Sequence, residues 1–167
     1  IDGNDYSAVQ IGDQIWMGEN LKVTHYRNGE AIPNVNDAGT WAGLSAGALC
    51  NYNNEVENAP IYGSLYNWHA VDDTRKLAPQ GWHIPSDNEW KALEMHLGMS
   101  QTDADNVSYR GTNEGSKLAG NPDLWAEGNL ISDPEFGLTG FSVLPSGFRY
   151  SDTGNYEVWI VAHTFGP

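Results

Sequence analysis

The sequence has one cysteine, few basic residues and no long apolar run. Cys50 alone can form neither an intramolecular disulfide nor a multi-cysteine zinc site. Only 8 lysines and arginines stand against 22 aspartates and glutamates, which gives a formal net charge of −14. That charge argues against nucleic acid or an anionic membrane surface as a partner. No apolar run approaches the roughly 20 residues that cross a bilayer, so no membrane insertion is expected.

Aromatic residues are plentiful. The chain contains seven tryptophans and eight tyrosines, and only 18% of its residues are charged. A disordered acidic segment lacks such aromatic anchors. A chain of 167 residues is long enough to bury one core, and no repeat or linker divides it. We therefore expect a single folded domain over residues 1–167.

The stretch WHIPSDNEWKALEMHLG, residues 82–98, predicts the clearest helix. Ser86 and Glu89 have the spacing of a capping box, which closes the first turn of a helix. Trp90, Leu93 and Leu97 then fall on one face at helical spacing. Gly98 suits the left-handed position that follows a helix end.

The remaining elements are expected to be short. Gly12–Asp13 predicts the turn of a hairpin, and Asn28–Gly29 predicts a second turn. The stretch IYGSLYNWHAV fits either a strand or a short helix, and GFSVLPSGFRY reads as one further strand with a turn. Residues 36–60 and 103–133 are polar and turn-rich and read as loops. These patterns predict an α+β domain with few elements and long loops.

Four ordered motifs resemble the Fibrobacter succinogenes major paralogous domain over about residues 1–155. They are DGNDYSAVQIGDQIWMGENLKVTHYRNGEAIP, YNNEVENAPIYGSLYNWHAV, KLAPQGWHIPSDNEW and GFSVLPSGFR. The segment IPSDNEW also resembles the LPTEAEW signature of the formylglycine-generating sulfatase-modifying family. The resemblance implies a C-type-lectin-like fold, with small twisted antiparallel sheets, one or two helices and long loops. It also implies a secreted or cell-surface protein of a gut or rumen bacterium.

The sequence departs from the family pattern at two places. Ala78 stands where relatives tend to have cysteine, so a cross-link of the relatives is expected to be missing. The ending NYEVWIVAHTFGP differs from the relatives' last strands, and a frame-slipped tail over residues 156–167 would explain it. In that case the chain is C-terminally truncated and Trp159 and His163 carry no selected function. An exposed sheet edge could then pair two copies into a homodimer.

Aromatic rings and amides in the loop-like stretches predict carbohydrate binding, because Trp and Tyr rings stack on sugar faces while amides bind hydroxyls. The alternative is that the rings are core, since a loop-rich domain without disulfides must bury aromatics. The candidate ligand-binding residues are Trp41, Tyr52, Asn53, Trp68 and Trp125.

A calcium site is a weaker hypothesis. Asp103, Asp105 and Asn106 form a D-x-D-N run that offers the oxygen ligands Ca²⁺ prefers. The run does not match the spaced loop of an EF-hand. Both aspartates equally fit turns or helix caps.

Hydrolysis is the alternative to binding. A glycoside hydrolase needs two carboxylates flanking the scissile bond, and Glu19, Glu55 and Glu57 are the candidates. The sequence has no nucleophile elbow and no HExxH motif. It also lacks the paired cysteines of formylglycine-generating enzymes, which excludes that activity.

Three functions therefore remain open. The leading one is an extracellular or cell-surface module that binds plant-type polysaccharide. The second is a glycoside hydrolase acting on cellulose or xylan. The third is a structural or protein-binding surface domain.

Overall fold

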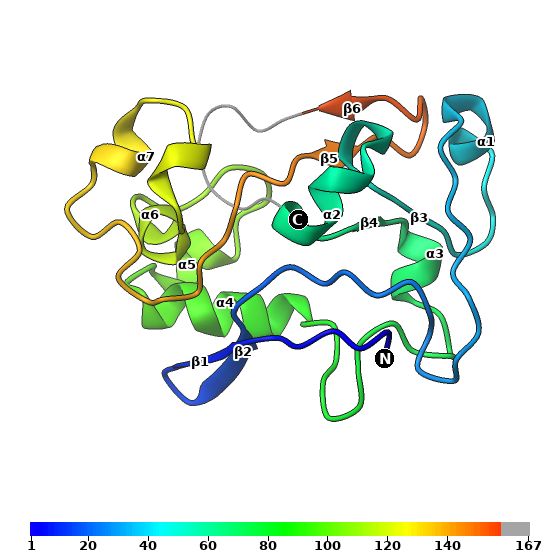
Figure 1. Cartoon of the computed structure of the whole chain (residues 1–167). Coiled ribbons are helices and arrows are strands. Elements are labelled where there is room, and N and C mark those ends of the chain that lie inside the picture. The colour runs from blue at the N-terminus through cyan, green and yellow to red at the C-terminus, as the bar shows by residue number, and fades with distance from the viewer. Residues whose placement is uncertain (158–167) are drawn as a thin grey trace. The chain divides into compact units, whose positions relative to one another are not determined.

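The computed structural model of the protein describes residues 1–157, which form two compact units (Figure 1). The first unit contains Ile1–Asp5, Asn20–Ile84 and the segment that begins at Ser146. The second contains Tyr6–Glu19 and Pro85–Pro145. The chain passes between the units several times, so neither is one contiguous stretch. The prediction of one domain over residues 1–167 is not tested by this division and stays a prediction.

The predicted helix is α4 (Asp87–His96), in the second unit. The Ser86 hydroxyl accepts from the Glu89 amide, and the Glu89 carboxylate accepts from the Ser86 amide at 2.8 Å. This reciprocal pair is the predicted capping box, which satisfies two amides that no helical carbonyl can reach. Gly98 follows the helix at φ +119°, a conformation that favours glycine.

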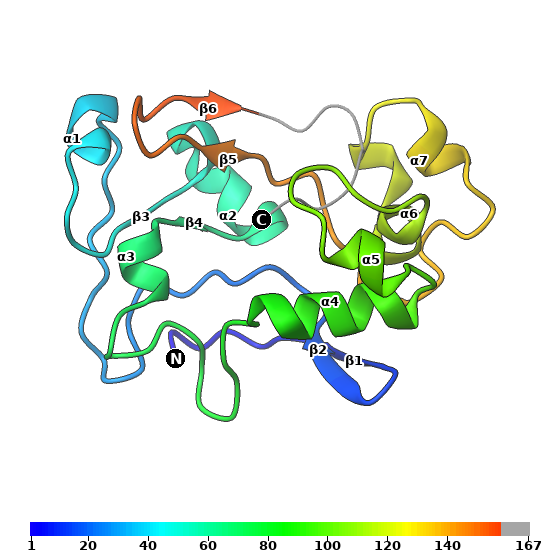
Figure 2. The same ribbon diagram turned by 180° about the vertical axis from the view of Figure 1, so that it is seen from behind.

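The predicted hairpin is also present in the second unit. Strands β1 (Ala8–Ile11) and β2 (Gln14–Met17) pair antiparallel around the Gly12–Asp13 turn. The Gln14 side chain donates to the carbonyl of Glu89 at 3.2 Å, which ties the hairpin to α4. Figure 2 shows the hairpin beside α4 from behind.

One apolar cluster holds the second unit together. Trp16 of the hairpin packs against Trp90 of α4 and against Phe141, with ring centroids 4.9 and 5.5 Å apart. The helix stripe is as predicted, because Leu93 and Leu97 are buried and Trp90 packs beside them. The unit also contains α5 (Gln101–Ala104), α6 (Glu114–Leu118), the 3₁₀ helix η3 (Pro122–Leu124) and α7 (Asn129–Ser132).

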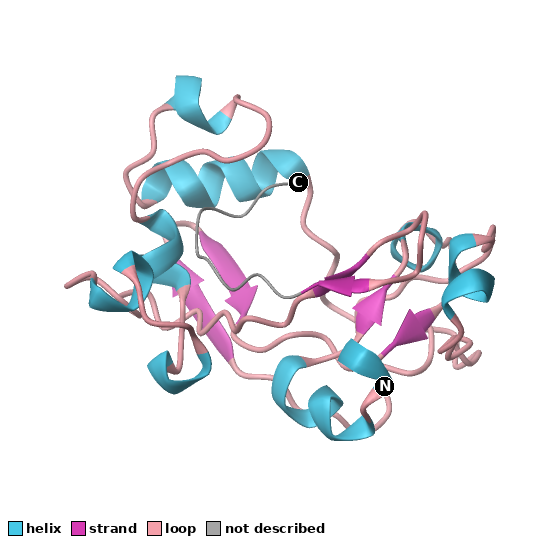
Figure 3. Cartoon of the chain, turned by 90° about the horizontal axis from the view of Figure 1, so that it is seen from above, coloured by secondary structure: helices cyan, strands magenta, loops and turns pink. Residues whose placement is uncertain are grey.

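The first unit contains two small antiparallel sheets. Strands β3 (Leu49–Cys50) and β4 (Leu65–Tyr66) form one, and β5 (Phe148–Arg149) and β6 (Tyr156–Glu157) form the other. Its helical elements are α1 (Ala38–Ala42), η1 (Tyr52–Asn54), η2 (Val56–Asn58), α2 (Ala59–Tyr62) and α3 (Trp68–Val71). The Asn28–Gly29 turn is confirmed, because the Tyr26 amide bonds to Glu30 O across it. Figure 3 shows how much of the chain is loop between these elements.

Two apolar clusters form the core of the first unit. One cluster contains the buried residues Val23, Tyr26, Leu49 and Leu77. The other contains Trp41, Ala48 and Cys50. Cys50 is thus a small buried residue of the core, next to the sheet of β3 and β4.

The α+β class with small antiparallel sheets is confirmed, whereas the expectation of one or two helices is wrong. Seven α-helices lie within residues 1–157, and six of them have only four or five residues. Residues 36–60 and 103–133 are therefore not simply loops. A helix of one turn is too short for an apolar stripe to repeat, so periodicity cannot predict it. The stretch 61–71 resolves into both alternatives, with β4 followed by α3.

Candidate ligand-binding site

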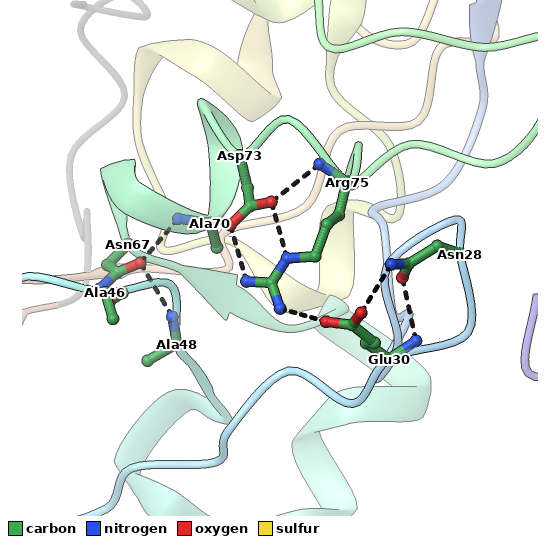
Figure 4. Close-up of polar contacts among 8 residues, drawn as sticks. All are labelled: Asn28, Glu30, Ala46, Ala48, Asn67, Ala70, Asp73 and Arg75. Atoms are coloured by element: carbon green, nitrogen blue, oxygen red, sulfur yellow. Dashed lines mark hydrogen bonds and ion pairs between the residues drawn. The ribbon is translucent and has the colours of Figure 1, made fainter.

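The start of α3 is fixed by one side chain. Asn67 is the N-cap, and its Oδ1 accepts from the amides of Ala70 and Ala48 at 3.0 Å each (Figure 4). Its Nδ2 donates to the carbonyl of Ala46 at 2.8 Å. The capping amide therefore also joins the helix to the chain that leads into β3. The first helical residue, Trp68, consequently sits on a rigid support.

Trp68 presents its ring to solvent. Its relative exposure is 70%, whereas Trp16 and Trp41 are buried and the other tryptophans among residues 1–157 are half-buried. Tryptophan is enriched at binding interfaces, because its large rigid ring supplies apolar contact area. We call the exposed ring and its Asn67 support the Trp68 platform.

An ion network lies beyond α3. The Arg75 guanidinium donates to both carboxylate oxygens of Asp73 and, at 2.7 Å, to Glu30 (Figure 4). Its carbon also lies 4.0 Å from the centre of the Tyr26 ring. The side-chain and backbone hydrogen bonds from Arg75 lower the pKa of Asp73 to about 2. The network joins the loop after α3 to the Asn28–Gly29 turn, where Glu30 also accepts from Asn28.

A second surface forms around the Asn-rich segment after β3. Asn53 and Asn54 are both left-handed, at φ +54° and +60°, which asparagine tolerates better than most residues. Asn54 is held by two contacts, from its Nδ2 to Asn36 O at 3.2 Å and from the Tyr156 hydroxyl to its Oδ1 at 2.6 Å. Asn53 is exposed, and its side chain has no hydrogen-bond partner among residues 1–157.

Two tyrosine rings meet next to the Asn53–Asn54 segment. Tyr52 meets Tyr156 edge to face, with centroids 5.6 Å apart. Gly147, at φ +65°, lets the chain approach Tyr52, because an added Cβ would lie 2.6 Å from the ring. Tyr150 follows β5 on the other face of the β5–β6 hairpin from Tyr156, where its ring meets Phe148 and its hydroxyl bonds to the Glu157 carboxylate. We call Tyr52, Asn53 and Tyr156 the tyrosine–asparagine surface.

The guanidinium of Arg149 packs against this surface at Tyr156. It donates to Gly154 O at 2.8 Å, to Val35 O at 2.6 Å and to Asn36 O at 2.8 Å. It also lies over two rings, 4.5 Å from the centroid of Trp41 and 4.7 Å from that of Tyr156. Burial, with a smaller contribution from Cys50, raises the pKa of Tyr156 above its ordinary value. This ring therefore stays neutral over the physiological range.

The prediction of Trp41 as a ligand-binding ring is wrong. Trp41 lies in α1 with only 5% exposure, under the guanidinium of Arg149. The ring is part of the core because the loop-rich unit buries aromatics in place of regular elements. Tyr52 and Asn53 do come together with each other, and Trp68 lies apart from them on α3.

Trp125 lies in the second unit and is half-buried. Its Nε1 donates to the carbonyl of Gly120 at 2.9 Å. The polar atom of this ring is thus used within the fold, and the Trp68 platform is the more exposed candidate.

The candidate catalytic glutamates are exposed. Glu19, in the second unit, accepts from the amide and hydroxyl of Ser7 at 3.2 Å each. Glu55 accepts from the Asn58 side chain at 3.3 Å, and Glu57 lies in η2. Glu55 and Glu57 belong to the first unit.

The candidate calcium ligands serve the fold around α5. The Asp103 carboxylate accepts from the hydroxyl of Ser100, the N-cap of α5, at 2.7 Å. Asp105 accepts from Gln101 and Lys91, and the Asn106 carbonyl accepts from Arg110 at 3.0 Å. No group of three His, Cys, Asp or Glu side chains within residues 1–157 is arranged to hold a metal ion.

Sequence reasoning missed Arg149, Tyr150 and Tyr156. Arg149 and Tyr150 stand in the GFRY segment, whose arginine follows an apolar run and precedes a turn. The local sequence places Arg149 at the end of an apolar run and does not show that its guanidinium binds loop carbonyls. Nothing in the local pattern says which carbonyls these are, since Asn36 is more than a hundred residues away.

These units define a mixed α and β protein with small antiparallel sheets. A scan against protein-family models matches the Fibrobacter succinogenes major domain over residues 9–165. The match covers most of the chain, and the protein belongs to this family. Searches of curated proteins and of solved structures gave no match. The predicted frame-slipped tail over residues 156–167, with Trp159 and His163, lies outside the described residues apart from β6, and the family match extends into it as far as residue 165.

None of the helices within residues 1–157 combines the length and the apolar character that a membrane span requires.

Proposed function

We propose that this protein is a secreted or cell-surface module that binds plant-type polysaccharide through the Trp68 platform. The supporting observation is the 70% exposure of an indole whose helix is anchored by three hydrogen bonds from Asn67. A rigid, exposed aromatic ring stacks on a sugar face with little loss of side-chain entropy. A C-type-lectin-like arrangement of the elements is part of the same proposal.

Charge favours a neutral ligand. A net charge of −14 repels acidic polymers and leaves neutral glycans such as cellulose and xylan. The hydrolase alternative gains no support from the glutamates, because no described contact directs Glu19, Glu55 or Glu57 towards a shared point. The dimer through a sheet edge remains a separate prediction for the assembled protein.

The test is retention on insoluble polysaccharides, with cellulose and xylan in the panel and reducing-sugar release measured in the same tubes. Wild type is retained without product, and Trp68→Ala loses about tenfold or more in affinity, as expected for a central aromatic anchor. Leu138→Ala is the matched control, since Leu138 is 65% exposed and lies in the other unit.

Equal retention of wild type and Trp68→Ala would contradict the proposal. Soluble product that disappears in Glu55→Gln or Glu57→Gln would replace binding with hydrolysis.

A further inference from the structure

Asp72 closes the short helix that carries Trp68. It is the C-cap of α3, and its amide donates to the carbonyl of Trp68 at 2.9 Å. The two residues are thus one helical turn apart, and residues at that spacing share a face of the helix with Cβ atoms about 6 Å apart. Helical side chains lean towards the turn that precedes them, so the Asp72 carboxylate is expected to lie over the turn that starts at Trp68.

The two aspartates after α3 differ in what their carboxylates bind. Both oxygens of Asp73 accept from the Arg75 guanidinium (Figure 4). The Asp72 side chain is exposed and has no hydrogen-bond or ion-pair partner among residues 1–157. Asp73 therefore serves the fold, whereas the acceptor oxygens of Asp72 are open to a ligand on the same helix face as the exposed indole.

An indole and a carboxylate on one helix face match two sides of a sugar ring. The indole packs against the apolar face of a pyranose, and the hydroxyls project from the edge of that ring. An ionised carboxylate has two acceptor oxygens and no donor, so it can bind two neighbouring hydroxyls at once. Hydrogen bonds to an ionised group are also about twice as strong as those between neutral groups. One sugar ring can therefore contact both side chains.

We propose that Asp72 selects the sugar that stacks on Trp68 by accepting hydrogen bonds from two of its neighbouring hydroxyls. The inference rests on the proposed function and adds a specificity-determining residue to it. The favoured ligand is a neutral chain whose hydroxyls are unsubstituted. O-acetylation removes the donors that the carboxylate requires, and a uronate polymer would bring a like charge towards Asp72.

The experiment is titration calorimetry with xylohexaose and cellohexaose, each also in a partly O-acetylated form. Wild type binds at least one free hexasaccharide about tenfold or more tightly than its acetylated form. Asp72→Asn keeps the size of the side chain, removes its charge and replaces one acceptor oxygen by a donor. The variant binds that free hexasaccharide about tenfold more weakly and binds the free and acetylated forms within about twofold of each other. Loss of this discrimination separates hydrogen bonding by Asp72 from steric blocking of the stack.

Asp123→Asn is the matched control. Asp123 is also exposed, has no side-chain partner within the described chain, and lies in the other unit. Its replacement changes the net charge by the same amount and leaves Trp68 and Asp72 in place. This variant is expected to bind both forms of each hexasaccharide like wild type.

The inference is overturned, and the proposed function stands, if Trp68→Ala weakens binding while Asp72→Asn binds the free hexasaccharides like wild type or keeps the discrimination. An equal loss in Asp123→Asn would assign the effect to net charge and would also overturn the inference. The same holds if wild type binds neither free hexasaccharide. If wild type is not retained on the insoluble polymers either, both proposals fail.

Discussion

Arg149 joins separate parts of the first unit through one side chain. One buried guanidinium serves three backbone carbonyls and lies over two aromatic rings. Arginine suits this place because its planar fork carries five donors in fixed directions, whereas lysine carries a compact point charge. The contacts fix the chain near Val35 and Asn36 against the hairpin of β5 and β6.

Arg149→Lys is therefore expected to lower the free energy of unfolding by about 2 kcal/mol, because the carbonyls of Gly154 and Val35 lose the guanidinium donor that binds them. Urea denaturation followed by fluorescence measures the change. Arg75→Lys is the control, because Arg75 is more exposed and surface ion pairs contribute about 0–1 kcal/mol. Equal losses in the two variants would contradict this account of Arg149.

The low pKa of Asp73 predicts how the stability of the fold changes with pH. Hydrogen bonds from Arg75 hold the pKa of its carboxyl at about 2, below the ordinary 3.8. As pH falls through the ordinary value, the unfolded chain takes up a proton while the folded carboxylate stays ionised. The Asp73–Arg75 pair therefore contributes its full share of the free energy of unfolding above about pH 4. This contribution is lost as the pH falls towards 2.

Carboxyl titration by NMR measures the Asp73 pKa directly. Arg75→Met, which removes the donor and keeps an apolar stem, is expected to return the pKa towards its ordinary value. An unchanged low pKa in that variant would assign the shift to another cause.

At the scale of elements, α4 and the β1–β2 hairpin could be predicted from the sequence, and the short helices could not. The capping box at Ser86 and the Gly12–Asp13 turn are local signals read within a few residues. Helix α3 depends on Asn67 reaching Ala46 and Ala48, which are about twenty residues away.

The candidate site, too, could be predicted from the sequence only in part. The sequence does not show that Trp68 is exposed and Trp41 buried, since both tryptophans lie in the first turn of a short helix with an Asn or Asp cap. Only the distant Arg149, packed over the Trp41 ring, decides between them. Aromatic content therefore predicts that a ring surface exists, and tertiary contacts determine which ring it is.

Ser86→Ala tests the element that the sequence predicted best. The variant loses the hydroxyl that caps α4, and its free energy of unfolding is expected to fall by about 1 kcal/mol. Asn88→Ala, at an exposed position in the same helix, is expected to stay within about 0.5 kcal/mol of wild type. Thermal and urea denaturation check both. A larger loss in the Asn88 variant would contradict the capping argument.

At the scale of the whole molecule, the acidic charge supports the proposal of a neutral ligand. The acidic charge disfavours the polyanions that basic proteins bind, and the apolar cores bury the rings of Trp16, Tyr26, Trp41 and Phe141. The proposed ligand contacts are the exposed Trp68 ring at the start of α3 and the Asp72 carboxylate at its end. Stacking of this kind depends little on salt, because no ion pair is formed.

The most direct measurement is acrylamide quenching of tryptophan fluorescence, in wild type and in Trp68→Phe, with and without soluble xylan or hydroxyethylcellulose. Trp68 is the one exposed indole within residues 1–157, so the difference between the two proteins reports on its ring. The account predicts a quenchable component that Trp68→Phe lacks and that the polysaccharide protects in wild type. Quenching that is the same with and without both polymers would contradict binding at Trp68.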